Sequence, residues 1–313
     1  MQVNGYFQFS LWDVGHGLAI WIKTPSGHNH WIDAGKEGDF SPSRHVFENY
    51  GESSLDYLII SHPDNDHIND LGNLVRTLGF PRVLVRNNTL PSHEKFESGT
   101  LDHQQAFMSL DRSYTAPVPW VHHPQNPAFN GGVEIRTAML NWDEAGWSAN
   151  NSSVVAFYHY AGWLFVMPGD IEESAWVNLW ARNEPAFSEL VERSRARVLV
   201  APHHGRESGY SPSMFDQIKP HITLVSDKKA KAPTCGSFRT RPIGLEHNPY
   251  SRILETPFQS SARQLFSQPQ SRSLVDMIGR MTTTKRFIST KSGGRAQFTI
   301  DSSGNCHLHV VEK

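Results

Sequence analysis

Short apolar runs separated by polar turns dominate the sequence, and most of the runs have the length of a buried strand. Strands are predicted at residues 6–12, 18–22, 30–34, 58–60, 81–86, 133–140, 150–157, 163–167, 197–201 and 222–226. Helices are predicted at 44–50, directly after residue 68, at 101–110, from residue 171 and near 260–266. The pattern therefore predicts a chain rich in both strands and helices, without an internal repeat.

Two further strands are predicted near the C-terminus, at residues 286–290 and 296–300. Gly293 and Gly294 lie between them, and glycines between two strand-like runs are typical of a hairpin. The sequence therefore predicts a hairpin in this region.

The stretch from Leu58 to Gly72 carries the clearest chemistry in the chain. Its apolar start predicts a buried strand that stops at Ser61. Four side chains that can bind a metal follow within six residues, namely His62, Asp64, Asp66 and His67. Carboxylate oxygens with imidazole nitrogens suit Zn²⁺, Mn²⁺ or Fe, and a tight turn at the end of a strand can gather them into a cup. The alternative is a polar loop with a chance excess of His and Asp, and four ligands directly after a buried strand disfavour it.

Other predicted strands also end in polar or glycine-containing turns. These turns are Asp13-Val14-Gly15-His16-Gly17, Ile32-Asp33-Ala34-Gly35, Gly169-Asp170 and His203-His204-Gly205, and Asn150 with Ser153 leads into the strand that ends at 157. Each feature alone is also typical of an ordinary turn or a helix N-cap.

Together these motifs resemble those of the metallo-β-lactamase fold superfamily, whose metal-binding motif has the usual form His-x-His-x-Asp-His. Here Asp64 takes the place of the second His, a departure that is common in the hydrolase domain of ComEC/Rec2-type competence proteins. The other motifs occur in family order, each at a predicted strand end. The resemblance implies a four-layer αββα sandwich of class α/β (α+β), with the metal cup at one edge between two sheets.

The resemblance also implies the make-up of the site. Two divalent ions are implied, Zn or Mn, with Mg and Fe as the other candidates. The implied metal ligands are His62, Asp64, Asp66, His67, Asp170 and His203. His203 is preferred to His204 because it follows its strand end as His62 follows its own. The implied catalytic residues are Asp66 and His204, and the implied substrate-binding or supporting residues are Asp13, His16, Asp33, Asn150 and Ser153.

The sequence departs from the family pattern at several positions. No third His lies near Asn150, so the first ion has an oxygen-rich set of ligands. His16 stands where the family has Gln, and Arg206 stands where it often has Ser. The late hairpin has Lys291 in place of Asp, so no role of that Asp is transferred.

Phosphodiester hydrolysis, above all of DNA or RNA, is the function that this family branch implies. Two ions would hold a bridging hydroxide with a pKa near ~7 and would cancel charge on the phosphate oxygens. One alternative is hydrolysis of a small ester, cyclic nucleotide, lactone or thioester. The other is a non-catalytic or regulatory subunit with a degenerate metal site, to which the missing third His points.

Charge is distributed unevenly along the 313 residues, whose formal net charge is −2. Residues 228–295 contain 13 Lys and Arg against 3 Asp and Glu, a net of +10, and the remaining residues have 16 basic and 28 acidic groups, a net of −12. Lys228, Lys229 and Lys231 are therefore candidate nucleic-acid contacts, with an ordinary solvated face as the alternative. We interpret the chain as one domain over 1–313 with a divergent basic insertion at about 228–284.

Cysteine content and hydropathy bear on the compartment. Cys235 and Cys306 are too few for a disulfide framework and indicate a reducing environment. No apolar run approaches the ~18 residues of a membrane span, and the N-terminus lacks the features of a signal peptide. Since competence proteins of the resembling type carry a membrane channel beside the hydrolase domain, we expect a stand-alone, cytoplasmic relative.

Overall fold

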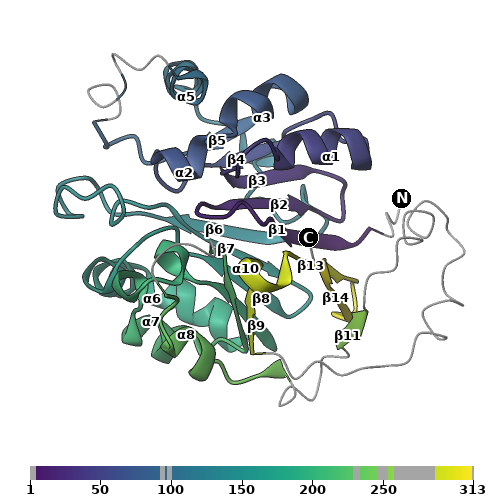
Figure 1. The fold of residues 1–313 in the computed structure, drawn as a ribbon, viewed down its shortest axis with the longest axis vertical. Helices are drawn as coiled ribbons and strands as arrows, with labels where there is room; N and C mark the ends of the chain where they lie inside the picture. The colour runs from purple at the N-terminus through teal and green to yellow at the C-terminus, as the bar shows by residue number, and fades with distance from the viewer. Residues whose placement is uncertain are drawn as a thin grey trace, which may run out of the picture.

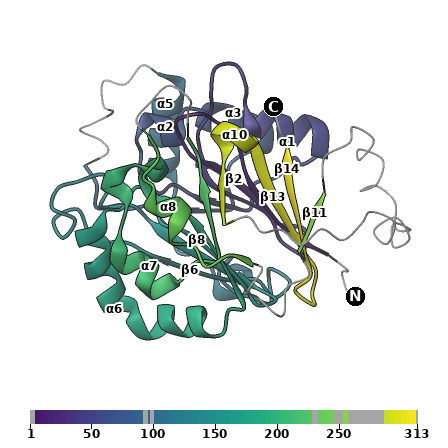
Figure 2. The ribbon, with the colours of Figure 1, turned by 60° about the horizontal axis from the view of Figure 1, so that its bottom comes forward.

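Four layers make up the molecule: helices, a sheet, a second sheet and further helices (Figure 1). The computed structural model describes residues 5–91, 96, 101–227, 233–245, 253–256 and 286–311. One group of helices covers the outer face of each sheet, and the view turned by 60° shows the same separation (Figure 2). This is the αββα sandwich that the sequence predicts, so the predicted fold class is confirmed.

Eight strands form the first sheet, in the order β11-β14-β13-β1-β2-β3-β4-β5. Antiparallel pairing joins β14, β13, β1, β2 and β3, whereas β3, β4 and β5 run parallel. The strands are β1 (Phe7–Leu11), β2 (Ala19–Lys23), β3 (Asn29–Ala34), β4 (Tyr57–Ile59), β5 (Val83–Val85), β11 (Ile253–Thr256), β13 (Arg295–Ile300) and β14 (Cys306–Val311).

Six strands form the second sheet, in the order β12-β10-β9-β8-β7-β6. β6, β7 and β8 pair antiparallel, and β8, β9, β10 and β12 run parallel. The strands are β6 (Glu134–Ala138), β7 (Val155–Tyr160), β8 (Trp163–Met167), β9 (Ala196–Val200), β10 (Ile222–Val225) and β12 (Phe287–Ser289).

The helices divide between the two outer layers. Those on the first sheet are α1 (Pro42–Tyr50), α2 (Asn65–Ile68), α3 (Leu71–Leu78) and α5 (Asp102–Ser113), and those on the second are α6 (Glu173–Glu192), α7 (Pro212–Ile218) and α8 (Ser237–Thr240). Short 3₁₀ turns lie at Trp120–His122, Pro202–Gly205 and Glu207–Gly209. Within the described residues, no helix is long and apolar enough to cross a membrane.

Three apolar cores separate the four layers. Between the sheets, aromatic rings of β1, β8 and β13 pack together, with ring centroids 4.5 Å apart for Phe9 and Phe165 and 5.4 Å apart for Phe165 and Phe298. A second core joins the first sheet to its helices, and a third joins the second sheet to α6 and α7. Because β4 and β8 are buried on both faces, they appear in the sequence as continuous apolar runs.

One prediction near the C-terminus is wrong. β12 and β13 do not form a hairpin, because β12 pairs with β10 in the second sheet and β13 pairs with β1 in the first. The four-residue helix α10 (Thr290–Gly293) carries the chain from one sheet to the other. Strand β14 was not expected, and the helix predicted near 260–266 lies outside the described residues.

Candidate metal centre

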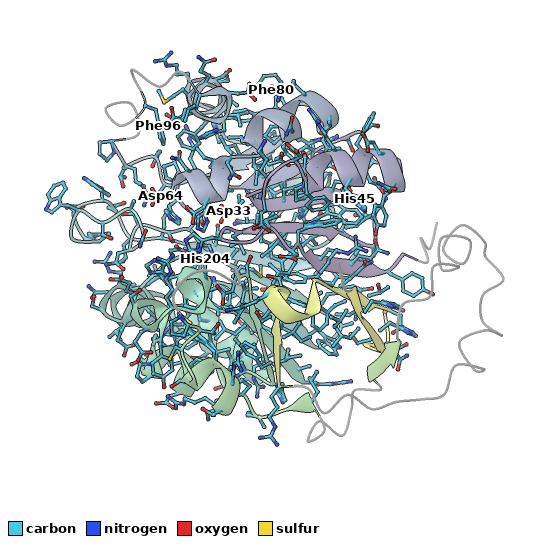
Figure 3. All side chains as sticks on the ribbon, viewed as in Figure 1. Asp33, His45, Asp64, Phe80, Phe96 and His204 are labelled. Atoms are coloured by element: carbon cyan, nitrogen blue, oxygen red, sulfur yellow. The ribbon has the colours of Figure 1, made fainter. Side chains whose placement is uncertain are left out.

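Several loops meet at one edge of the sandwich. β3 and β4 run parallel in the first sheet, and β8 and β9 run parallel in the second. The segments that leave the carboxyl ends of these strands therefore gather at their sheet's edge. In Figure 3, Asp33 and Asp64 of the first half lie opposite His204 of the second half.

Asp33 organises the first half of the site. Its backbone has a positive φ of 55°, and its side chain is fully buried. Asp33 Oδ2 lies 2.7 Å from His67 Nδ1. The same carboxylate accepts hydrogen bonds from the Ser61 amide at 2.7 Å and the Ser61 hydroxyl at 2.6 Å. With a proton on Nδ1 donated to Asp33, His67 presents the Nε2 lone pair to the site, as metal-binding histidines do.

His62 is held in the same tautomer by hydroxyl groups. Its Nδ1 lies 3.1 Å from Ser61 Oγ and 3.4 Å from Ser153 Oγ. Because the Ser61 hydroxyl already donates to Asp33, it can accept the proton of His62 Nδ1. The buried Nε2 of His62 then has no hydrogen-bond partner within the described part of the chain. A fully buried imidazole lone pair without a partner is what a bound cation would explain.

Asp170 enters from the second sheet. Gly169, with a φ of 62°, turns the chain after β8, and the Asp170 amide donates to Ser153 Oγ at 3.1 Å. Asp170 Oδ1 lies 3.4 Å from His67 Nε2, and Oδ2 lies 3.5 Å from His204 Nε2. His62, His67 and Asp170 together place one ligand atom each within 4.8 Å of the others, and we call these three residues the inner trio.

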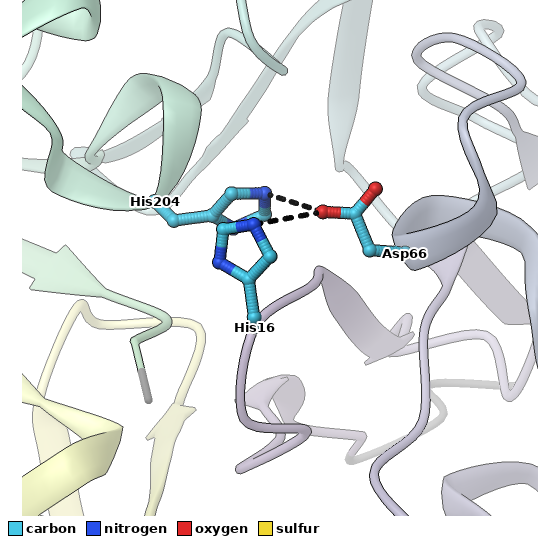
Figure 4. A group of neighbouring side chains, drawn as sticks. All are labelled: His16, Asp66 and His204. Atoms are coloured by element: carbon cyan, nitrogen blue, oxygen red, sulfur yellow. Dashed lines mark ion pairs between the residues drawn. The ribbon is translucent and has the colours of Figure 1, made fainter. Parts of the chain in front are cut away.

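A second group lies beside the first and is more exposed. His16, Asp66 and His204 also place one ligand atom each within 4.8 Å of the others, and we call them the outer trio (Figure 4). Asp66 Oδ2 lies 3.3 Å from His16 Nε2 and 3.2 Å from His204 Nε2. His204 Nε2 is also 3.3 Å from His67 Nε2, so the two trios touch.

The two adjacent histidines after β9 occupy other places than the sequence suggested. His204 reaches the site, whereas His203 lies outside both trios, with its Nδ1 2.8 Å from Ser208 Oγ. The physical reason is the backbone: both residues have left-handed conformations, with φ of 49° and 54°. The preference for His203 rested on its position just past a strand end, like that of His62, and the turn at Pro202–Gly205 instead brings the second histidine into a trio.

The remaining candidates surround the trios. Asp64 Oδ2 lies 3.7 Å from His62 Nε2, close to the inner trio but outside it. Asp13 Oδ1 accepts from the Gly15 amide at 3.4 Å and so orders the turn that carries His16. The Asn150 carbonyl accepts from the Ser153 amide at 3.0 Å and closes the turn before β7. The candidate nucleic-acid contacts Lys228, Lys229 and Lys231 lie outside the described residues.

Asp170 and Asp66 are held in the charged form. Burial opposes ionisation of Asp170, but the positive charges of His67 and His204 outweigh it and hold the pKa of Asp170 well below its usual range. For Asp66, burial is likewise outweighed, first by the hydrogen bond with His204, and the pKa falls. Ionised carboxylates are the form that binds metal ions.

The histidines of the inner trio differ in charge. Burial, and after it the charge of His67, lowers the pKa of His62 to about 4, so His62 is neutral at physiological pH. Burial opposes protonation of His67 too, but Asp170 and Asp33 outweigh it and raise the pKa of His67. These carboxylates attract positive charge to the centre of the site, where a divalent ion can replace the proton of His67.

Ligand spacing fits divalent metal ions. A tetrahedral site with metal–ligand bonds of ~2.0–2.1 Å has ligand atoms ~3.3–3.4 Å apart. The contacts within the trios measure 3.2 and 3.3 Å in the outer trio and 3.4 Å in the inner trio. The residues present therefore fit ions that are bound by imidazole nitrogen and carboxylate oxygen.

His16 lies in a group that could hold a metal ion, which the sequence did not predict for it. The resemblance implied that His16 binds substrate or supports the site. The structure places its imidazole in a ligand group, with the ring centroid 4.4 Å from that of His204. The signal in the sequence was the change from an amide to a metal-binding side chain in a turn near the expected site.

Comparison with known proteins places these observations in a family. Residues 13–166 match the family model described as the Metallo-beta-lactamase superfamily. ComE operon protein 3 of Bacillus subtilis (strain 168) is 22% identical over 276 residues, which cover 81% of this chain and 31% of that protein. The chain thus spans about a third of the length of this relative. The superfamily matched is one of mostly hydrolytic enzymes whose fold implies divalent metal ions.

Proposed function

Residues 13–166 match the metallo-β-lactamase superfamily, and from this premise we propose that the chain hydrolyses phosphodiesters, with nucleic acid as the substrate class, using two divalent ions. The observation that carries the proposal is the contact between the inner and outer trios, where His204 Nε2 lies 3.3 Å from His67 Nε2. Two ligand groups this close suit ions ~3.5–4 Å apart, the arrangement that nucleases and phosphatases use for in-line displacement.

The proposed ligands follow from the geometry. His62, His67 and Asp170 hold the inner ion, and Asp66 with His204 holds the outer ion. Asp170 directs one oxygen at His67 and the other at His204, as a carboxylate between two ions would. His204 thereby takes the ligand role that the sequence interpretation gave to His203. Zn²⁺ and Mn²⁺ suit this mixture of nitrogen and oxygen ligands best, with Mg²⁺ and Fe as the other candidates.

The protein's own residues fix and charge the site. Divalent ions, when bound, supply a water nucleophile activated at neutral pH and neutralise charge on phosphate oxygens. Asp33 and the hydroxyls of Ser61 and Ser153 hold the two inner histidines in their ligand tautomer. Asp66, which is 29% exposed, stays ionised on the side of the site that substrate can reach. We propose that it orients the nucleophile as well as binding the outer ion.

A substrate panel tests this function. The purified protein would be assayed with single-stranded and duplex DNA, RNA, cyclic nucleotides and bis-p-nitrophenyl phosphate, with Mn²⁺, Mg²⁺ and Zn²⁺ in turn. We expect hydrolysis of phosphodiesters that depends on the added ion. Metal-replete protein that cleaves a lactone or thioester but no phosphodiester would overturn the proposed substrate class.

Asp66→Ala tests the role of the outer carboxylate. We expect hydrolysis to fall by ~10²-fold or more, the loss seen when a group that stabilises the transition state is removed, while circular dichroism shows an intact fold. Asp143→Ala is the matched control, because Asp143 is an exposed carboxylate in the 141–147 turn and belongs to neither trio. Residual activity of Asp66→Ala above a tenth of wild type, with metal content confirmed, rules out the role.

A further inference from the structure

The outer trio lacks a full set of ligands if only the family positions are counted. Asp66 and His204 alone give the outer ion two ligands besides the Asp170 oxygen that lies 3.5 Å from His204. His16 is the one other His, Cys, Asp or Glu that the described residues bring into the outer trio.

The backbone around His16 is anchored on both sides of the residue. The Leu18 amide donates to the Asp66 carbonyl at 3.3 Å, and the Ser226 hydroxyl of the second sheet donates to the Gly17 carbonyl at 2.6 Å. Gly17 has a φ of 153°, and a Cβ there would lie 2.4 Å from the Asp66 carbonyl oxygen. The turn therefore packs directly on the backbone of Asp66, and this packing sets the distance between the His16 ring and the Asp66 carboxylate.

The side chain of His16 is placed as a ligand would be. Its Nε2 lies 3.3 Å from Asp66 Oδ2, the separation expected for two ligands of one tetrahedral ion. The ring is 17% exposed, which is low for a side chain in a turn. From these contacts we propose that His16, in the β1–β2 turn, is a ligand of the outer metal ion. This inference rests on the proposed two-ion site.

Arg206 offers a competing use for the same lone pair. Its Nη2 lies 2.7 Å from His16 Nε2, and one lone pair cannot both accept this hydrogen bond and bind an ion. Arg206 has a long, flexible and partly exposed side chain, whereas the His16 turn is fixed at Leu18 and Gly17. The guanidinium can therefore move away from an arriving ion, and the alternative is that His16 serves only to position Arg206.

Zinc binding to the metal-stripped protein distinguishes these roles. Isothermal titration and elemental analysis after dialysis would compare wild type with His16→Gln, which restores the residue that the family has in this turn. We expect wild type to bind two ions and His16→Gln to lose more than ~100-fold in affinity for one of them, beyond the ~10–100-fold cost of losing a supporting group. The visible spectrum of the Co²⁺-loaded protein should change in the same variant.

Two control variants make the result decisive. His203→Gln removes a neighbouring imidazole that lies outside both trios, and Arg206→Gln removes the competing donor. Both should bind two Zn²⁺ ions with affinities within a few-fold of wild type. The inference is overturned if wild type binds one ion, if His16→Gln loses less than ~100-fold in affinity, or if Arg206→Gln loses as much as His16→Gln. A chain that binds two ions through His16 but cleaves no phosphodiester would refute the proposed function alone.

Discussion

At the scale of single residues, the buried Asp33 carboxylate fixes the tautomer of His67, so that Nε2 faces the site. It accepts from His67 Nδ1 and from two groups of Ser61, and it has no exposure to solvent. In Asp33→Asn, the amide can keep its size but loses the negative charge that makes His67 a strong donor. We expect Zn²⁺ affinity to fall by ~10–100-fold, measured by titration against a chelator of known affinity.

Asp56→Asn is the matched control for this prediction. Asp56 is also buried and accepts a hydrogen bond from a backbone amide, that of Asn29 at 2.9 Å, but its side chain contacts Asn29 and Arg82 rather than a residue of either trio. Its substitution should lower the free energy of unfolding by ~1–3 kcal/mol, as for other weakened buried hydrogen bonds, without changing Zn²⁺ affinity. Equal effects of the two variants on Zn²⁺ affinity would show that Asp33 acts through stability only.

At the scale of elements, the turn after β8 places Asp170. Gly169 has a φ of 62°, and a Cβ there would lie 2.8 Å from Ser153 Oγ and 2.9 Å from Ser61 Cβ. Gly169→Ala must therefore push apart the two serines that hold His62. Gly146 has nearly the same φ, 67°, but a Cβ there would meet nothing within 4 Å, so Gly146→Ala carries the backbone strain alone.

We expect Gly146→Ala to cost ~1 kcal/mol of stability and to leave metal binding unchanged. Gly169→Ala should cost a further ~1–3 kcal/mol from overpacking, and it should weaken Zn²⁺ binding because Asp170 follows directly. Denaturant melts of the metal-stripped proteins and Zn²⁺ titration measure the two effects. If the two alanine variants behave alike, the packing around Gly169 does not position the site.

Elements differed in how far the sequence could predict them. Strands buried on both faces, such as β8 (Trp163–Met167), appear as apolar runs of the right length, so their bounds were predicted closely. The prediction of a hairpin at 286–300 was wrong because strand pairing depends on distant partners. Here β12 pairs with β10, and β13 pairs with β1. The place of the two histidines after β9 could not be predicted, because the left-handed backbone that brings His204, not His203, into a trio leaves no mark in the sequence.

At the scale of the whole molecule, the site joins the two halves of the sandwich. His62 and His67 come from segments next to the first sheet, and Asp170 and His204 come from segments next to the second. An ion held by both halves binds the folded state only, and it should stabilise that state by ~2.7 kcal/mol at a free concentration 100 times its dissociation constant. This stabilisation adds to the apolar core between the sheets, where Phe165 packs on Phe9 and Phe298.

Calorimetry of two variants separates these contributions. Asp170→Asn should lose most of the rise in melting temperature that Zn²⁺ gives to wild type, because this carboxylate faces ligands of both trios. Phe165→Ala should lower the melting temperature with and without Zn²⁺, since truncating a buried Phe costs ~3–5 kcal/mol, and it should keep the Zn²⁺ increment. An unchanged increment in Asp170→Asn would mean that the ions do not connect the sheets, and two separate transitions in Phe165→Ala would mean that the sheets unfold independently.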